Sequence, residues 1–267
     1  MAWLRPTPHN NKARAPWRWA LAGACIGGAT ALVGYAPAYW LANGLAWATQ
    51  GQLQLREPRG TVWNGSAQWV LTGGNASRDQ MALPGRVSWQ MRPGLTALAM
   101  RWNADCCMAQ PLPIRIQPRW GGATITLATH QSQWPAALLT GLGTPWNTIQ
   151  PQGQLLLKTQ NLSLALNAGR LQVGGSADLD VMAVTSRLST LQPLGSYRVR
   201  IEGGDMTSLQ LSTLDGALQL QGQGQWVGQR LRFQGEAWAA EGREAALANL
   251  LTMIGQRSGK RVLLSVG

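Results

Sequence analysis

The sequence predicts a mainly β protein, with a single N-terminal transmembrane helix, a long curved antiparallel β-sheet domain and a C-terminal helix. The first observation behind this prediction is an uncharged run from Trp19 to Leu55. The second is a period-two alternation of apolar and polar residues beyond residue 50, which is the pattern of antiparallel strands with one apolar face. The third is one helical apolar repeat near the end of the chain.

The composition favours a folded chain with little catalytic equipment. Of the 267 residues, 45% are hydrophobic and 14 are Trp, which supplies enough apolar surface for a core. Only two His and eleven Asp or Glu are present, and these residue types carry most acid–base and metal chemistry. We therefore expect no enzymatic activity and no catalytic, cofactor-binding or metal-binding residues.

The first 41 residues have the charge pattern of a membrane anchor. Residues 1–18 hold four cations and no acid, and we interpret them as a cytoplasmic basic arm. Residues 19–41 are apolar and would make a helix of about 34 Å, enough to span a bilayer. Cations before the span and none just after it predict a cytoplasmic N-terminus, with residues 42–267 on the far side. We assign the anchoring contacts to Trp19, Gly23, Gly27 and Trp40.

Two features of this stretch admit other interpretations. Ala36-Pro37-Ala38 has the small-x-small form of a signal peptidase site, but the apolar run continues past it, which favours an uncleaved anchor. Gly23 and Gly27 form a GxxxG step that lets a second helix approach closely, although small residues are also common in spans that make no such contact.

The excess of positive charge does not indicate nucleic-acid binding. Lys and Arg number 23 against 11 Asp and Glu, a formal net charge of +12. Without the four cations of the arm, 19 against 11 leaves +8 on the rest of the chain. These cations are spread out, whereas nucleic-acid binding surfaces gather them on one element beside aromatic residues.

The clearest strands form a hairpin near the C-terminus. From Gly216 to Trp226, Leu218, Leu220 and Trp226 share one face and Gln residues occupy the other. After a turn, a second strand repeats the pattern with Phe233 on its apolar face. A Gly-initiated strand start recurs at 51, 153, 169 and 216, and we expect further strands at 60–71, 85–91, 113–119, 123–127, 176–184, 196–202 and 208–212.

Two segments depart from the alternation and predict helices. Trp134 to Leu142 is short and apolar, with Ser132 available as an N-cap. From Glu241 to Gln256, four apolar residues follow helical spacing, and acids at the start and cations after the end suit the helix dipole. We expect this second helix to close one end of the sheet.

Tryptophan and cysteine each leave alternatives open. The ten Trp residues beyond the anchor are expected to fill the core, and the alternative is a concave amphipathic sheet face that holds a lipid or a partner strand. Cys106 and Cys107 are adjacent, so they do not make the usual bridge between distant segments. Buried free thiols, a vicinal disulfide and pairing with another chain remain open.

The remaining candidates for chemistry stand alone. His130 is the only histidine beyond the N-terminal arm and has no carboxylate near it in sequence, which favours a loop histidine over a catalytic one. Asp178 and Asp180 are expected to share a strand face. Because two carboxylates make a poor calcium site, a solvated edge is the favoured interpretation.

Several motifs follow one another along nearly the whole chain. The apolar stretch ends in PAYWLA at residues 37–42, GTVWNGSA follows at 60–67 and contains Trp63 and Gly65, and the G-x-L-x-L-x-G-x-G-x-W strand at 216–226 precedes FQGEA at 233–237. In this order they resemble protein N of the bacterial type II secretion system. The resemblance implies a single-pass protein of the Gram-negative inner membrane, with a periplasmic domain and no catalytic residues.

The resemblance also implies a role. It is that of an accessory component that supports protein secretion across the outer membrane through contacts with other secretion components, either the inner-membrane platform or the secretin. A fainter likeness to AsmA-like envelope proteins, whose curved sheets hold lipid, implies the alternative of a periplasmic lipid-binding module with an amphipathic β-groove.

Overall fold

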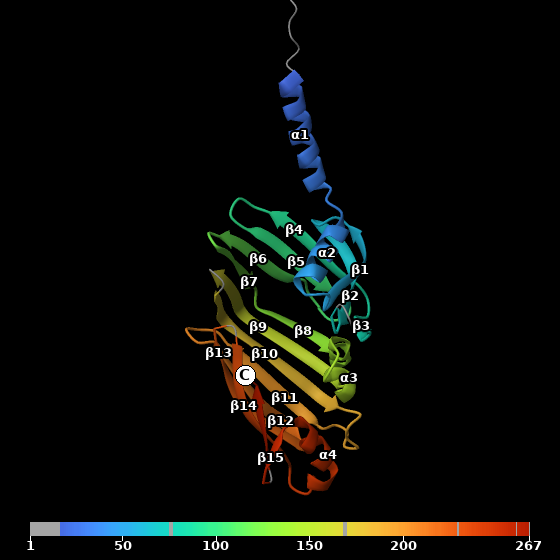
Figure 1. Ribbon diagram of the computed structural model, residues 1–267, viewed down its shortest axis with the longest axis vertical. Coiled ribbons are helices and arrows are strands. Elements are labelled where there is room, and N and C mark those ends of the chain that lie inside the picture. The colour runs from blue at the N-terminus through green and yellow to red at the C-terminus, as the bar shows by residue number, and fades with distance from the viewer. Residues whose placement is uncertain (1–16, 75–76, 168–169, 229, 260, 267) are drawn as a thin grey trace, which may run out of the picture. The chain divides into compact units, whose positions relative to one another are not determined.

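The computed structural model describes residues 17–74, 77–167, 170–228, 230–259 and 261–266. Within these residues, sixteen strands form one sheet in which every pairing is antiparallel, as predicted. The strand order follows the chain order closely, so the colour in Figure 1 changes steadily along the sheet. The strands are β1 Leu53–Gly60, β2 Asn64–Thr72, β3 Gln80–Ala82, β4 Val87–Pro93, β5 Leu98–Ala104, β6 Leu112–Arg119, β7 Gly122–Leu127, β8 His130–Pro135, β9 Gln152–Asn167, β10 Arg170–Thr185, β11 Gly195–Glu202, β12 Ser208–Gly216, β13 Leu218–Val227, β14 Arg230–Ala239, β15 Gln256–Ser258 and β16 Arg261–Val266.

The predicted uninterrupted helix from Trp19 to Leu41 is wrong in its extent. The first helix, α1 (Trp17–Gly34), ends before Pro37, and α2 (Ala38–Ala48) begins after it. Proline has no backbone N–H and its ring collides with the carbonyl one turn back, so it does not continue a helix. Here Pro37 instead makes a β-bridge with Thr61. Trp40 therefore belongs to α2, whereas Trp19, Gly23 and Gly27 belong to α1.

The chain divides into two compact units between Ala36 and Pro37. In the first unit, none of the residues of α1 is buried, and a Cβ added at Gly23 or Gly27 would meet no atom within 4 Å. Among the residues that the structure describes, no helix combines the length and the apolarity that crossing a bilayer requires. The second unit contains all of the strands.

The period-two pattern of the sequence gives the sheet two different faces. Residues directly opposite each other on paired strands point to the same side, so the face of each strand follows from the register. The apolar face carries Leu55, Trp69, Trp89, Trp102, Ile114, Ile125, Leu164, Leu179, Val199 and Leu209. The polar face carries Gln90, Arg101, Arg115, Lys158, Asp178, Arg200, Gln210, Gln223 and Gln234.

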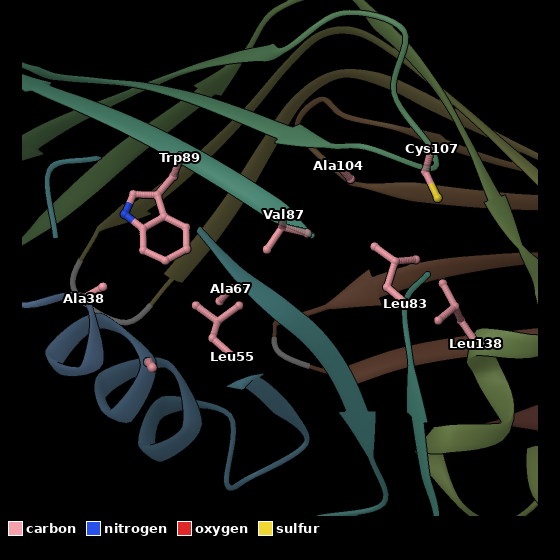
Figure 2. Close-up of a cluster of buried hydrophobic side chains, with 10 residues drawn as sticks. Ala38, Leu55, Ala67, Leu83, Val87, Trp89, Ala104, Cys107 and Leu138 are labelled. Atoms are coloured by element: carbon pink, nitrogen blue, oxygen red, sulfur yellow. The ribbon is translucent and has the colours of Figure 1, made fainter. Parts of the chain in front are cut away.

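The first strands pack their apolar face into an N-terminal core, which α2 and the 3-10 helix η1 (Ala136–Leu142) cover. Figure 2 shows Trp89, Val87, Ala67 and Leu83 pointing into this cluster. Trp89 is 1% exposed, and its Nε1 donates a hydrogen bond to the carbonyl of Val62 at 3.0 Å. Three more tryptophans, Trp69, Trp102 and Trp134, pack against the buried residues.

The last strands pack the same face into a C-terminal core beneath α4 (Glu244–Ile254). Leu247, Leu250 and Leu251 are buried, which confirms the predicted C-terminal helix with shorter bounds. Their neighbours include Tyr197 and Leu218, and the Tyr197 hydroxyl donates to the Leu218 carbonyl at 3.1 Å. Burial raises the pKa of Tyr197, so this hydroxyl keeps its proton.

The other predicted helix is only partly present. Trp134 belongs to β8, and the helical turn begins after Pro135. The prediction of Ser132 as an N-cap is wrong, because Ser132 lies in the same strand and its hydroxyl accepts a hydrogen bond from Trp134 Nε1 at 2.8 Å. Strand β8 pairs with β9 over residues 154–159, next to the segment of β9 that pairs with β7.

Candidate functional site

The residues singled out in the sequence motifs lie in two separate parts of the sheet. Gly65 lies in β2 and faces the N-terminal core, and Trp63 lies in the β1–β2 turn, where its carbonyl accepts a hydrogen bond from the Met91 amide at 2.6 Å. Leu218 is buried in the C-terminal core, and Leu220 packs against it. The structure therefore does not bring the two motifs together, and the residues of each motif pack in a different core.

The glycines of the two motifs make room for aromatic rings. A Cβ added at Gly65 would lie 2.6 Å from a ring carbon of Trp89, so no larger residue fits beneath this ring. In the C-terminal motif, Gly222 and Gly235 lie opposite each other, and the ring of Phe233 covers both. Trp226 ends the same apolar row at the far end of β13, opposite Leu231.

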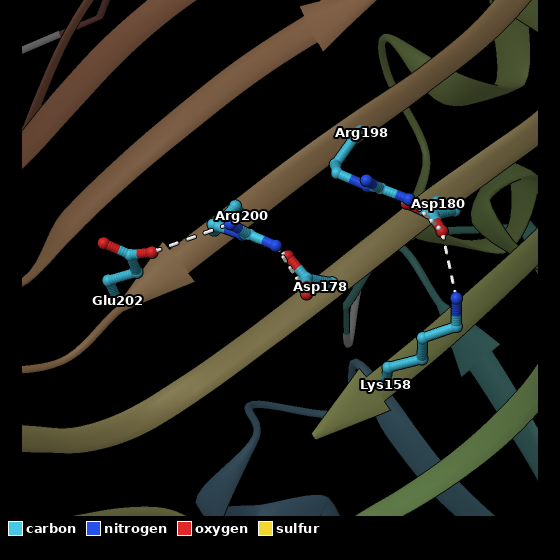
Figure 3. A network of polar contacts seen from close by, with 6 residues as sticks. All are labelled: Lys158, Asp178, Asp180, Arg198, Arg200 and Glu202. Atoms are coloured by element: carbon cyan, nitrogen blue, oxygen red, sulfur yellow. Dashed lines mark hydrogen bonds and ion pairs between the residues drawn. The ribbon is translucent and has the colours of Figure 1, made fainter. Parts of the chain in front are cut away.

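A ladder of six charged residues crosses the polar face in the middle of the sheet. Figure 3 shows Lys158 on β9, Asp178 and Asp180 on β10, and three charged residues on β11. Arg198 binds Asp180 through two hydrogen bonds of 2.6 and 2.9 Å, and Arg200 binds Asp178 in the same way at 2.6 and 3.1 Å. The ladder is completed by Lys158, 3.5 Å from Asp180, and Glu202, 3.9 Å from Arg200.

The two aspartates are not at a solvated edge, which corrects the interpretation from the sequence. Asp178 is 8% exposed and Asp180 4% exposed, because the longer Arg and Lys side chains lie over them. The hydrogen bonds from Arg198 lower the pKa of Asp180, and they outweigh the opposite effect of burial. Each carboxylate is paired with one arginine through two charge-assisted hydrogen bonds, so this ladder joins neighbouring strands by opposite charges.

A family model for protein N of the type II secretion system matches residues 51–263. The chain belongs to this family. The match spans the strands from β1 to β15 and the first part of β16, so family membership describes the sheet. No curated protein and no solved structure matches this chain significantly.

Membership in the protein N family assigns the chain an accessory role in type II secretion. The family is a component of the secretion machinery and is not known as an enzyme, and membership implies interaction with other type II secretion components. Within the described residues, no group of three or more His, Cys, Asp or Glu is arranged to hold a metal ion.

On the polar face of this protein N family member, β12, β13 and β14 form a shallow depression, which we call the glutamine hollow. It has a volume of about 740 Å³. A second hollow of about 910 Å³ adjoins it over β13, β14 and β16 and shares Gln223 and Gln234 with it. The glutamine hollow is lined by Ser208, Gln210, Gln223, Gln225, Arg232 and Gln234, among others.

Cys106 and Cys107 form a disulfide with each other, in the loop between β5 and β6. They lie beside His130 in a hollow of about 680 Å³. His130 is the first residue of β8 and not a loop residue, and its Nε2 atom is buried with no hydrogen-bond partner in the described part of the chain. Burial lowers the pKa of this imidazole. Among the residues that the structure describes, no carboxylate accepts a hydrogen bond from this imidazole, which is the orienting contact of a catalytic histidine.

Between the two cores, the apolar face of this family member is only partly buried by the described residues. Ile114, Ile125, Leu164 and Leu209 are only partly buried, and they belong to neither core. They continue the same face from strand to strand. The middle of the sheet therefore offers an apolar strip with a core at either end.

Sequence reasoning missed the ladder and the hollow, although the signals were present. Asp178 and Asp180 were recognised as sharing a face, but the cations at the same spacing of two on the next strand, Arg198 and Arg200, were not matched to them. Likewise the sequence places the Gln residues of β13 on one face of a single strand, with no partner on its neighbours. Only the register of β12, β13 and β14 shows that they gather over one depression.

Proposed function

We propose that this protein is an accessory component of the type II secretion machinery at the inner membrane, tethered through residues 19–41. Its sheet domain, residues 42–267, acts in the periplasm through contacts with other secretion components. The basic residues before α1 and the absence of charge from Trp19 to Leu55 support this placement. The inner-membrane platform and the secretin are the two partners that the proposal admits.

The observation that carries the contact proposal is the glutamine hollow. Each Gln amide offers two N–H donors and one carbonyl acceptor, so a row of them matches the alternating donors and acceptors of an extended main chain. Gln210, Gln223 and Gln234 lie directly opposite one another on three neighbouring strands. All three are exposed, so a strand or loop of a secretion component can lie across them without first displacing other side chains.

Site-specific photo-crosslinking in secreting cells tests this proposal. A photoreactive residue at Gln223 should crosslink the protein to a secretion component, whereas the same residue at the exposed Thr190, in the loop between β10 and β11, should not. Secretion should also fall when Gln210 and Gln223 are replaced together by Glu. Absence of a specific crosslink at Gln223, together with undiminished secretion by the double variant, would overturn the proposal.

A second candidate function is that of a lipid-binding module, and the partly buried apolar strip favours it. Ile114, Ile125 and Leu164 line this strip on three neighbouring strands. Acyl chains packed against them would bury these side chains, as α2 and α4 bury the residues of the two cores. Native mass spectrometry of the protein reads this out directly. Phospholipid that stays bound to the wild type and is lost from the Ile125→Glu variant supports the module, and a lipid-free spectrum of the wild type contradicts it.

A further inference from the structure

One side of the sheet carries exposed apolar residues at the turns of successive hairpins. All pairings are antiparallel in the order β4-β5-β6-β7-β9-β10-β11-β12-β13-β14, so the turns that follow β4, β6, β9, β11 and β13 lie on the same side. We call this side the tip rim. In Figure 1 the β4–β5 and β6–β7 hairpins close one after the other along the left side of the sheet.

Large apolar side chains project into solvent at or beside these turns. The side chains of Leu95, after β4, and Trp120, after β6, are fully exposed, at 106% and 105%. Met206, after β11, is 69% exposed and Val227, at the end of β13, is 55% exposed. Leu166, near the end of β9, is also exposed. Soluble surfaces scatter single apolar residues, but a repeat at consecutive hairpin turns on one side indicates a shared apolar environment.

The opposite side of the sheet is different. There most connections between strands are longer, and several carry η1, α3 (Trp146–Ile149) and α4 and contribute buried residues to the two cores. The exception is the single-residue connection between β12 and β13, beside which Leu214 is 43% exposed. The exposed apolar residues of the tip rim are thus not a general property of the turns in this sheet.

Cations lie directly behind the apolar residues of the tip rim. Arg92 is the second-last residue of β4 and Arg119 the last residue of β6, and both are exposed. Arg230 and Arg232, at the start of β14, are also exposed. None of these four makes an ion pair with a described residue. The rim also holds Asp205, beside Met206.

The chain enters the sheet domain at this same side. Pro37, the first residue of the second unit, is bridged to Thr61 in the β1–β2 turn. In the antiparallel order, this turn lies on the side of the turns that follow β4 and β6. The start of the second unit therefore lies on the same side of the sheet as the tip rim.

We propose that the tip rim contacts the surface of an anionic phospholipid bilayer. The apolar tips, with Trp120 and Leu95 foremost, enter the interface between headgroups and acyl chains, where Trp is favoured. Arg92, Arg119 and Arg230 bind phosphate and anionic headgroups. The proposal rests on the membrane placement given above, and it adds that the sheet lies with this side against the bilayer and does not extend freely from its tether.

Depth measurements on the full chain in vesicles test this contact. The free cysteine Cys25 is replaced by Ser, and one cysteine at position 120 (Trp120→Cys) carries an environment-sensitive NBD fluorophore. The matched control carries the label at the exposed Thr190, on the opposite side. In vesicles of phosphatidylglycerol and phosphatidylcholine, the label at 120 should shift its emission to the blue and be quenched by doxyl-labelled lipid. The label at 190 should do neither.

A charge-reversal experiment distinguishes binding to anionic headgroups from an apolar contact alone. Replacing Arg92 and Arg119 by Glu should weaken the quenching at position 120 by at least about fivefold, since each cation near an anionic surface contributes about this factor. The control replaces Arg78 and Arg187 by Glu, which changes the net charge equally and leaves the rim intact. Equal effects of the two double variants would overturn the assignment of the cations.

The outcomes distinguish this proposal from the proposed function. If the wild-type chain floats with vesicles while the label at 120 stays in water, the rim proposal fails and the tether stands. If the chain does not float at all, both the rim contact and the membrane placement fail, whereas the secretion contact is decided independently by the crosslink at Gln223. Burial of the label at 120 by a secretion protein, and not by vesicles, would also overturn the rim proposal.

Discussion

The two cores at the ends of the sheet use the same apolar face but fill it in different ways. The N-terminal core is built from tryptophan rings, with Trp89 at its centre and Trp69 and Trp102 packed edge to face at 5.3 Å. The C-terminal core is built mainly from leucines, three of which come from one turn and a half of α4. The comparison teaches that the two cores take their large side chains from different places. The strands supply the tryptophans of the N-terminal core, whereas the covering helix α4 supplies three of the leucines of the C-terminal core.

The largest expected effect is in the tryptophan core. Replacing Trp89 by Ala should lower the free energy of unfolding by about 3–5 kcal/mol, because a large buried ring is lost and its cavity remains. Chemical denaturation of the full chain in mild detergent measures this. Trp120→Ala is the matched control, and because Trp120 is fully exposed it should change stability by less than about 0.5 kcal/mol. Equal losses for both variants would show that the tryptophan core is not the stabilising element.

The leucine core should be somewhat less sensitive. Leu247 is 0% exposed, and Leu247→Ala should cost about 2–4 kcal/mol through lost burial and a residual cavity. Met253, exposed on the same helix, provides the control Met253→Ala. If the two cores belong to one cooperative sheet, Leu247→Ala and Trp89→Ala shift a single unfolding transition. Two separate transitions would show that the ends of the sheet unfold independently.

The charged ladder lies between the two cores, so substitutions in it measure how much these ion pairs stabilise the sheet. Asp180→Asn removes the charge that Arg198 and Lys158 share, and should cost about 1–3 kcal/mol at neutral pH, since a buried partner is left poorly satisfied. Glu236→Gln, which breaks a more exposed pair with Arg261, should cost less than about 1 kcal/mol.

The lowered pKa of Asp180 also predicts how the free energy of unfolding changes with pH. The pKa of Asp180 is lowered from the ordinary value of 3.8 in the folded state. The unfolded chain therefore binds its proton first as the pH falls, so the stabilisation is complete above about 3.8 and is lost as the pH falls through the folded value. Asp180→Asn should flatten this part of the acid unfolding curve, and an unchanged curve would contradict the role of the carboxylate.

The smallest expected effect concerns the histidine beside the tryptophan core. Burial lowers the pKa of His130 from 6.5, so protonation favours the unfolded chain and stability is lost as the pH falls below 6.5. His130→Gln should remove this loss, which thermal unfolding at pH 7.5 and 5.5 would measure as a smaller shift of Tm. Gln131→His, an imidazole on the exposed neighbour, should add no acid sensitivity. A wild-type Tm that is equal at both pH values would contradict the prediction.

Local pattern was enough to predict the sheet, because alternation over one strand needs no information from distant parts of the chain. The hairpin of β13 and β14 and the helix α4 were predicted within three residues of their bounds. The break at Pro37 was overlooked because apolar composition continues across it. Short strands such as β8 were missed because the four residues His130 to Gln133 are all polar, so the segment has no apolar–polar alternation and no β-branched residue.

The candidate site was less predictable, because it depends on register. Whether Asp178 meets Arg200 or solvent is decided by how β11 aligns with β10, and a shift of one residue would place the cations on the other face. The tip rim depends in the same way on the direction of every strand, which a sequence pattern alone does not contain.

The order of the strands also has a consequence for how this sheet forms. Because most strands pair with the strand that precedes them in the chain, the contacts are local, and sheets of this kind fold faster than those joined by distant strands. The sheet can grow from β1 as the chain is delivered, with each new hairpin pairing along the last open edge. The polypeptide would thus never expose more than one unpaired edge at its growing end, which limits aggregation while synthesis is still under way.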